Sequence, residues 1–142
     1  MSGFSKVRLA CLLLVVGVGL SRGLAQAEDK PANRLFEMRT YIANEGKFED
    51  LHKRFREHTN KLFEKHGMTL IGYWTPVEGP EAKNTLVYIL AYPNREAREK
   101  SWKAFMADPD WQAAYKASHA NGPLVKEAKS TFLNPTDYSP IK

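Results

Sequence analysis

Residues 84–106 read NTLVYILAYPNREAREKSWKAFM, and this stretch decides the fold because it joins a strand directly to a helix. Its first part, 84–92, is rich in β-branched and aromatic residues, which is typical of a strand. Asn94 follows at a position where its side chain can cap a helix. The apolar residues of that helix are Ala97, Trp102, Phe105 and Met106. The stretch therefore predicts a β-strand followed at once by a capped α-helix.

Upstream of this stretch the sequence predicts another helix and another strand. Apolar residues at three-to-four spacing indicate a helix from about residue 47 to residue 65. The stripe consists of Phe48, Leu51, Phe55, Leu62 and Phe63. His66-Gly67 ends this helix, since glycine suits the left-handed position after a helix C-terminus. Residues 69–77 then read as a strand, and the breaker-rich connection 78–83 predicts an antiparallel hairpin with 84–92.

The outer parts of the chain complete a β-α-β-β-α-β order. Residues 35–41 are expected to form the first strand, and 125–133 the last. Between them, Asp108-Pro109 indicates the start of an extra short helix, which Asn121-Gly122-Pro123 ends. This order is the split βαβ arrangement of ferredoxin-like folds. The sequence therefore predicts an α+β domain with helices on one face of a four-stranded antiparallel sheet.

The other face of the sheet is expected to be covered by a second copy of the chain. Phe36 and Met38 share one face of the first strand. In the strand 84–92, alternate apolar residues point to opposite faces of the sheet, so neither face is polar enough to remain in water. One set is Leu86, Tyr88 and Leu90, and the other is Val87, Ile89 and Ala91. The sequence therefore predicts a homodimer built through the face opposite the helices, as in a dimeric α/β barrel.

The first 27 residues are predicted to be a cleavable signal peptide. Lys6 and Arg8 precede the apolar stretch 9–20, the small-residue site Ala25-Gln26-Ala27 follows, and cleavage is expected before Glu28. A transit peptide and a retained membrane anchor are the alternatives, but transit peptides are amphipathic, and a membrane span needs about 20 apolar residues. Residues 28–34 read as a disordered tether, 35–134 as the domain and 135–142 as a tail. The sequence therefore predicts an exported protein, periplasmic or secreted.

Composition excludes several classes of function. Cys11 is the only cysteine and leaves with the signal, so the mature chain is expected to have no disulfide and no thiol chemistry. The formal net charge of +5 falls when the three basic residues of the signal are removed. The remaining charges alternate in sign along the helices, which is typical of solvated faces. Nothing in this pattern indicates nucleic-acid binding.

Four segments together resemble the NIPSNAP family. They are FEMRTY (36–41), GYWTPVEG (72–79), LVYILAYPNREAREKSWKAF (86–105) and DPDW (108–111). The resemblance spans nearly all of 35–133 and implies a dimeric α/β barrel, in which two sheets pack face to face. It carries over no catalytic residues. The better-known relatives look like mitochondrial proteins linked to trafficking or organelle quality control, whereas this chain is predicted to have one domain and a secretory signal.

The first strand carries the best candidate for a ligand site. Glu37, Arg39 and Tyr41 share a face, and a carboxylate, a guanidinium and a phenol can together orient a small polar ligand. Trp74 and Tyr88 are expected to extend such a pocket, although neighbouring residues of one strand, such as Tyr73 and Trp74, must face opposite sides. The alternative is that the polar residues form cross-strand pairs or a dimer interface, and that the aromatic residues belong to the core.

No metal or cofactor is expected. The candidate metal ligands are His52, His58, His66 and His119. The first three are six and eight residues apart, whereas ligands on one helix should be three or four apart. Capping positions and positions at the edge of the apolar stripe explain them more simply. The sequence also has no phosphate loop, dinucleotide fingerprint or nucleophile elbow.

Two hypotheses of function follow, from different classes. The first is a non-enzymatic, homodimeric NIPSNAP-domain protein that binds a small molecule or another protein. The second is a cofactor-independent enzyme similar to the small monooxygenases of dimeric α/β-barrel architecture, which rests on analogy of fold. The enzyme needs an enclosed cavity with convergent polar groups, whereas a binding module can act through a filled core and its surface.

Overall fold

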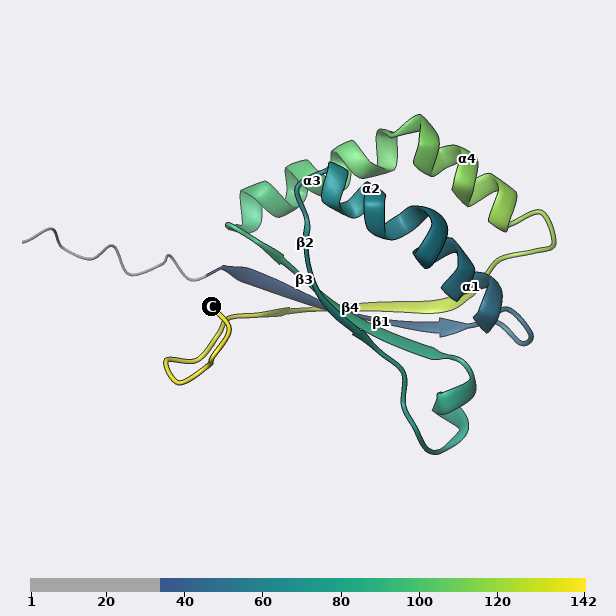
Figure 1. Cartoon of the computed structure of the whole chain (residues 1–142), viewed down its shortest axis with the longest axis horizontal. Helices are drawn as coiled ribbons and strands as arrows, with labels where there is room; N and C mark the ends of the chain where they lie inside the picture. Colours follow the sequence, from purple (N-terminus) through teal and green to yellow (C-terminus); the bar gives the residue numbers. More distant parts are fainter. Residues whose placement is uncertain (1–33) are drawn as a thin grey trace, which may run out of the picture.

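Four strands form one antiparallel sheet in the computed structural model, which describes residues 34–142 (Figure 1). They are β1 (Leu35–Ala43), β2 (Thr69–Trp74), β3 (Thr85–Tyr92) and β4 (Val125–Leu133). Their order across the sheet is β2-β3-β1-β4, so β3 and β1 lie in the centre. The predicted signal peptide, 1–27, and residues 28–33 of the predicted tether lie outside the described residues.

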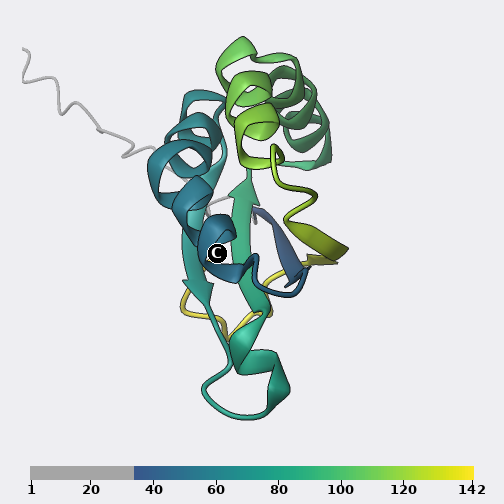
Figure 2. The same ribbon diagram turned by 90° about the vertical axis from the view of Figure 1, so that its right-hand side faces the viewer.

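The helices cover one face of this sheet (Figure 2). α1 (Phe48–Arg54), the π-helix η1 (Phe55–Thr59) and α2 (Asn60–Lys65) follow β1, whereas α3 (Arg95–Ala107) and α4 (Pro109–Ser118) follow β3. A short 3-10 helix, η2 (Pro80–Lys83), lies in the connection between β2 and β3. The predicted ferredoxin-like α+β class and its order of elements are therefore confirmed. β2 ends three residues before the predicted boundary, and Pro76 in the omitted part has no N–H for a sheet hydrogen bond.

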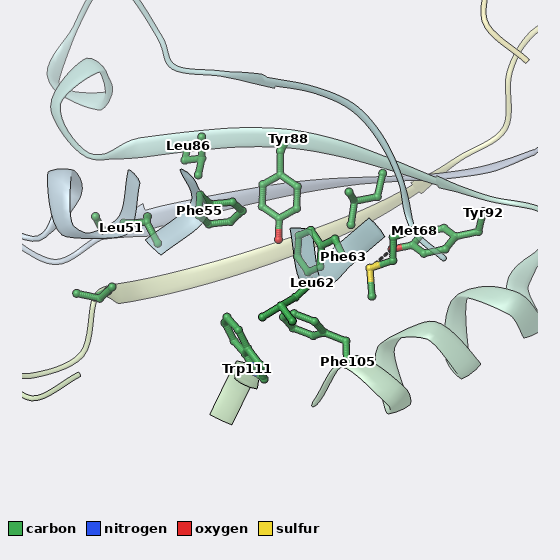
Figure 3. Close-up of a cluster of buried hydrophobic side chains, with 13 residues drawn as sticks. Leu51, Phe55, Leu62, Phe63, Met68, Leu86, Tyr88, Tyr92, Phe105 and Trp111 are labelled. Carbon is green, nitrogen blue, oxygen red and sulfur yellow. Dashed lines mark hydrogen bonds between the residues drawn. The ribbon is translucent and has the colours of Figure 1, made fainter. Parts of the chain in front are cut away.

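Aromatic side chains fill the space between the sheet and the helices (Figure 3). The ring of Phe63 on α2 lies 4.8 Å from that of Phe105 on α3 and 6.1 Å from that of Tyr88 on β3, measured between centroids. Phe55 lies 5.2 Å from Tyr88 in the same way. These contacts join η1 and α2 to β3 and join α2 to α3, so the core lies on the helix side of β3.

The predicted single helix of about 47–65 is interrupted in its middle by a turn of π-helix. The extra residue of a π turn shifts the helical face, and the Thr59 hydroxyl donates to the Arg54 carbonyl at 3.2 Å across this turn. Both residues are buried, at 5% exposure for Arg54 and 2% for Thr59. The π turn therefore accompanies the burial of two polar residues on the inner side of the helix.

Side-chain caps fix the starts of α3 and α4, as the sequence predicts. The Asn94 side chain accepts a hydrogen bond from the Ala97 N–H at 2.8 Å, and Asp108 accepts one from Asp110 at the start of α4. Lys65 and His66 also contact the Asp108 carboxylate, at 2.8 and 2.7 Å, and their hydrogen bonds lower its pKa. Asp108 therefore ties the end of α2 to the junction of α3 and α4.

Candidate functional site

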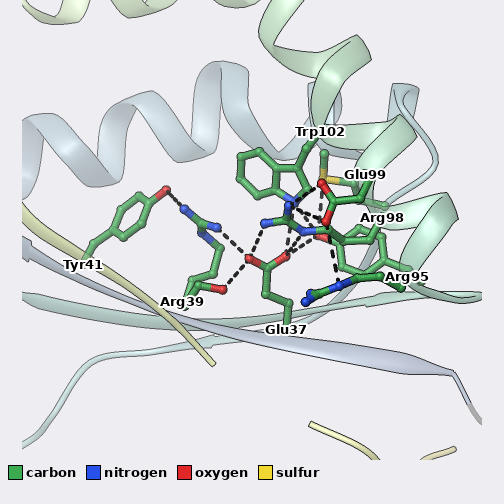
Figure 4. A network of polar contacts seen from close by, with 10 residues as sticks. Glu37, Arg39, Tyr41, Arg95, Arg98, Glu99 and Trp102 are labelled. Atoms are coloured by element: carbon green, nitrogen blue, oxygen red, sulfur yellow. Dashed lines mark hydrogen bonds and ion pairs between the residues drawn. The ribbon is translucent and has the colours of Figure 1, made fainter. Parts of the chain in front are cut away.

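A single buried carboxylate, Glu37, organises the polar groups between the sheet and the helices (Figure 4). Arg98 on α3 donates to both its oxygens, at 2.8 and 2.9 Å, and Arg39 on β1 donates at 2.7 Å. Ser130 on β4 donates at 2.6 Å. Tyr92 and Trp102 add hydrogen bonds at 3.1 and 3.2 Å. Glu37 is completely buried, so this network replaces the water that the carboxylate loses.

The network keeps Glu37 ionised. Burial by itself raises the pKa of Glu37, but hydrogen bonds from Arg98, Ser130 and Arg39 outweigh that effect and lower the pKa from 4.5 to about 2. A carboxylate with several charge-assisted hydrogen bonds behaves in this way. Glu37 therefore provides a permanent negative charge for the two arginines at neutral pH.

Arg39 extends from this network toward the centre of the helix-facing side. One end of its guanidinium binds Glu37, and the other donates to the Tyr41 hydroxyl at 3.2 Å. The guanidinium lies 4.4 Å from the centroid of the Trp102 ring, within the range of a cation–π contact. Arg39 is therefore held by three neighbours on β1 and α3.

A cavity of about 290 Å³ lies beside Arg39, between the sheet and the helices. It is bounded by Arg39, Tyr41, Arg54, Thr59, Phe63, Trp102, Phe105, Met106, Trp111, Tyr115, His119, Pro123, Val125 and Ala128. Six of these are aromatic and two are arginines, and none of the described lining residues is acidic. Such a wall suits an organic molecule with a flat apolar body.

Arg54 is the second cation of the cavity, and its surroundings differ from those of Arg39. Its guanidinium lies 5.2 Å from the Trp111 ring and 5.7 Å from the Tyr115 ring. It donates one long hydrogen bond, 3.4 Å, to the Ser118 hydroxyl, and its Nε, like that of Arg39, has no partner among the described residues. Burial lowers the pKa of Arg54, which reflects the cost of holding a charge there.

The structure brings together four of the five residues that the sequence proposes for a ligand site. Glu37, Arg39 and Tyr41 lie on the helix-facing side of β1, and Tyr88 is the β3 partner of Arg39. Tyr88 is completely buried and is not among the residues that line the cavity, and its hydroxyl has no partner among the described residues. This placement removes the three polar residues from the face where the dimer is expected.

Trp74, the fifth proposed residue, lies on the opposite face of the sheet. It pairs with Val87, whereas its neighbour Tyr73 pairs with Tyr88 on the helix side. The Trp74 ring lies over Gly72, where an added Cβ would come within 2.6 Å of a ring atom. Trp74 is 51% exposed and therefore belongs to the uncovered face, away from the cavity.

Several residues that line the cavity are not part of the ligand site predicted from the sequence, and the sequence indicates them only weakly. Arg54 follows Leu51 by three positions, so it lies beside the apolar stripe, and a charged residue there is a signal for a buried cation. Trp102 is expected from the sequence among the apolar residues of a helix, and Trp111 belongs to the segment DPDW, whereas both also line the cavity. Tyr115 on α4 and His119, the residue that follows the end of α4, stack at 3.9 Å between ring centroids.

The histidines do not converge. His66 contacts the Asp108 carboxylate, and His119 lies beside Tyr115. In residues 34–142 no group of three or more His, Cys, Asp or Glu side chains is arranged to hold a metal ion. Across the same residues no helix is both long and apolar enough to cross a bilayer.

The fold and its comparisons define the class of protein. A sheet of order β2-β3-β1-β4 with helices on one face is the ferredoxin-like arrangement. The chain belongs to the NIPSNAP family, because the family model matches residues 36–140. The resemblance read from the four sequence segments is therefore confirmed.

Solved structures of similar fold agree with this assignment. A NIPSNAP domain protein from Burkholderia xenovorans is 28% identical with a TM-score of 0.64, and the match covers 75% of this chain and 98% of that one. A NIPSNAP family protein from Agrobacterium tumefaciens is 24% identical with a TM-score of 0.68, covering 78% and 96%. SnoaB, a cofactor-independent oxygenase from Streptomyces nogalater, shares the fold at 13% identity and a TM-score of 0.51, covering 77% and 99%. No curated protein matches the chain.

Proposed function

We propose that this NIPSNAP domain binds a small organic molecule in the cavity between its sheet and its helices. The observation that carries the proposal is the cavity of about 290 Å³, which is walled by aromatic rings and two arginines. Small-molecule sites are typically apolar clefts of about 300–1,000 Å³ with a few fixed polar groups, and this cavity is just below the lower limit of that range. The ligand is therefore a compact molecule.

The Glu37 network supports the proposal because it holds one of those polar groups in place. Arg39 has a carboxylate on one side, a phenol on another and an indole beneath it. Such support keeps a binding group in one orientation before the ligand arrives, which reduces the entropy lost on binding. Arg39 is therefore assigned to ligand binding, with Glu37 as its positioning residue.

We further propose that the domain acts as an exported homodimer, joined through the sheet face opposite the helices. Partly exposed apolar side chains on the central strands support this arrangement, with Met38 and Ile89 paired across β1 and β3. Trp74 adds an exposed indole to the same face. Export stays a prediction that intact-mass measurement of the native protein tests, since a species retaining residues 1–27 contradicts it.

Filling the cavity is expected to weaken ligand binding without unfolding the protein. The neutral probe 2-naphthol is expected to bind the purified wild type with a Kd between about 10 µM and 1 mM, measured by isothermal titration calorimetry. Ala128 is exposed and lines the cavity from β4, so Ala128→Phe places a ring in the space that the probe needs. We expect its affinity to fall by about tenfold or more.

Ala120→Phe is the matched control, because Ala120 is exposed in the turn after α4 and does not line the cavity. This variant is expected to bind 2-naphthol as the wild type does. Absence of binding to the wild type, or equal binding by Ala128→Phe and the wild type, would overturn the proposed site.

A further inference from the structure

We propose that the ligand of this cavity is an organic anion and that Arg54 holds its acidic group. This inference rests on the proposed function and names the chemical class of the ligand: a carboxylate or similar monoanion on a flat apolar body. The two arginines of the cavity differ in their counter-ions, and that difference carries the inference.

Arg39 has a counter-ion inside the protein. Its Nη1 lies 2.7 Å from Glu37, and Arg98 shares the same carboxylate while also contacting Glu99 at 3.3 Å. The positive charge at this end of the cavity is therefore largely compensated within the fold. Glu37 accepts from both arginines, and little uncompensated charge remains there for a ligand.

Arg54 has no such counter-ion. It is 5% exposed, and no carboxylate of the described residues lies within 4.0 Å of it. Its protein partners are one hydroxyl at 3.4 Å and the faces of two aromatic rings. A buried charge without a partner is costly, and buried charges in proteins are usually paired or hold ligands.

The shape of the lining selects the rest of the ligand. Trp111 and Tyr115, on which the Arg54 guanidinium stacks, also line the cavity, together with Trp102 and Phe105. Aromatic faces favour a planar apolar body, whereas a strongly hydrated ion such as phosphate would find few hydrogen-bond donors there. The acidic group is therefore expected at Arg54 and the apolar body among the indole and phenyl rings.

The local backbone is consistent with a functional role for Arg54. It is the last residue of α1 and directly precedes the π-helix, whose inner turn is closed by the Thr59 hydroxyl on the Arg54 carbonyl. π turns are costly relative to regular helix and are frequent at functional sites. A purely structural explanation is that Arg54 stays in place only through its two cation–π contacts.

A pair of probes that differ in charge separates these explanations. 2-Naphthoate and 2-naphthamide have the same ring system, and the first is an anion while the second is neutral. By calorimetry the wild type is expected to bind 2-naphthoate about tenfold to a hundredfold more tightly than 2-naphthamide, as for a hydrogen-bonded charge. Ala128→Phe is expected to weaken both probes, which places both in the cavity.

Arg54→Gln is expected to remove this preference, so that the variant binds 2-naphthoate no more than about threefold more tightly than 2-naphthamide. Arg56→Gln is the matched control. Arg56 lies two residues after Arg54, its side chain is exposed and it pairs with Glu49, so the substitution removes the same charge from outside the cavity. That variant is expected to keep the preference. Arg54→Lys is expected to restore part of it, since lysine keeps the charge but loses the planar fork.

Thermal unfolding of the ligand-free variants gives a second readout. If Arg54 serves the ligand, Arg54→Met has an equal or higher Tm than the wild type, because an uncompensated charge leaves the interior. Two outcomes would overturn the inference: the wild type binds both probes equally, or the anion preference survives in Arg54→Gln. In either case, binding of the neutral probe would still support the proposed site. Loss of all binding overturns the proposed function itself.

Discussion

Replacing Glu37 with leucine is expected to lower the free energy of unfolding by about 3–5 kcal/mol, the cost of removing one partner from a buried ion pair. The leucine has a similar volume, so the loss comes from the charges that remain. Arg39 and Arg98 are left close together without a carboxylate between them, and the Tyr92, Trp102 and Ser130 donors lose their acceptor. Urea unfolding of the variant and the wild type measures the difference.

Glu37→Gln is the control, because it keeps an acceptor for the neutral donors and is expected to lose less stability than Glu37→Leu.

The pH dependence of stability provides an independent check. The pKa of Glu37 is depressed in the folded state, so its contribution of about 3 kcal/mol is present above pH 4.5 and is lost as pH falls toward 2. Glu37→Leu is expected to flatten this part of the curve. A loss below about 1 kcal/mol in Glu37→Leu would contradict the role assigned to the network.

Replacing Ile89 with glutamate is expected to convert the proposed dimer into a monomer at micromolar concentration. Ile89 lies on the central strand β3, on the face opposite the helices, where it pairs with Met38 on one side and Gly72 on the other. A stable two-fold interface buries about 1,200 Å² or more, and a carboxylate in its centre is unpaired. We expect the dimer dissociation constant to rise by about a hundredfold or more, measured by light scattering and sedimentation.

Ala113→Glu is the control for this change, because it places the same carboxylate on an exposed position of α4 in the helical layer. It is expected to remain a dimer. A monomeric wild type, or an Ile89→Glu variant that retains the mass of a dimer, would contradict the proposed interface.

The alternation of side chains along a strand and the residues that start and end a helix are local properties, and for this reason the sequence predicts them well. Asn94, Asp108 and Gly67 act at the helix ends where their chemistry places them. The shared face of Glu37, Arg39 and Tyr41 also follows from the period of two in a strand. That this polar face points toward the helices does not follow from β1 alone, since the faces are decided by the partners across the sheet.

The π turn and the cavity could not be predicted in the same way. A π turn adds one residue to a helix without a composition of its own, so the spacing of Phe55 and Leu62 reads as an ordinary gap in the stripe. The cavity is lined from β1, α1, α3, α4 and β4, so it depends on distances between elements that are far apart in the sequence, such as β1 and α4. Arg54 shows the limit most clearly, because its lack of a counter-ion among residues 34–142 is visible only when the surrounding elements are in place.

The three tryptophans offer the most direct measurement of where a ligand binds. Trp102 and Trp111 line the cavity, whereas Trp74 lies on the opposite face of the sheet. Each indole N–H gives its own resonance in a nitrogen–proton NMR spectrum, assigned through Trp→Phe variants. On titration with 2-naphthol the Trp102 and Trp111 resonances are expected to shift together and saturate, while that of Trp74 stays in place. A shift of Trp74 with the other two unchanged would contradict the central claim that the cavity under the helices is the binding site.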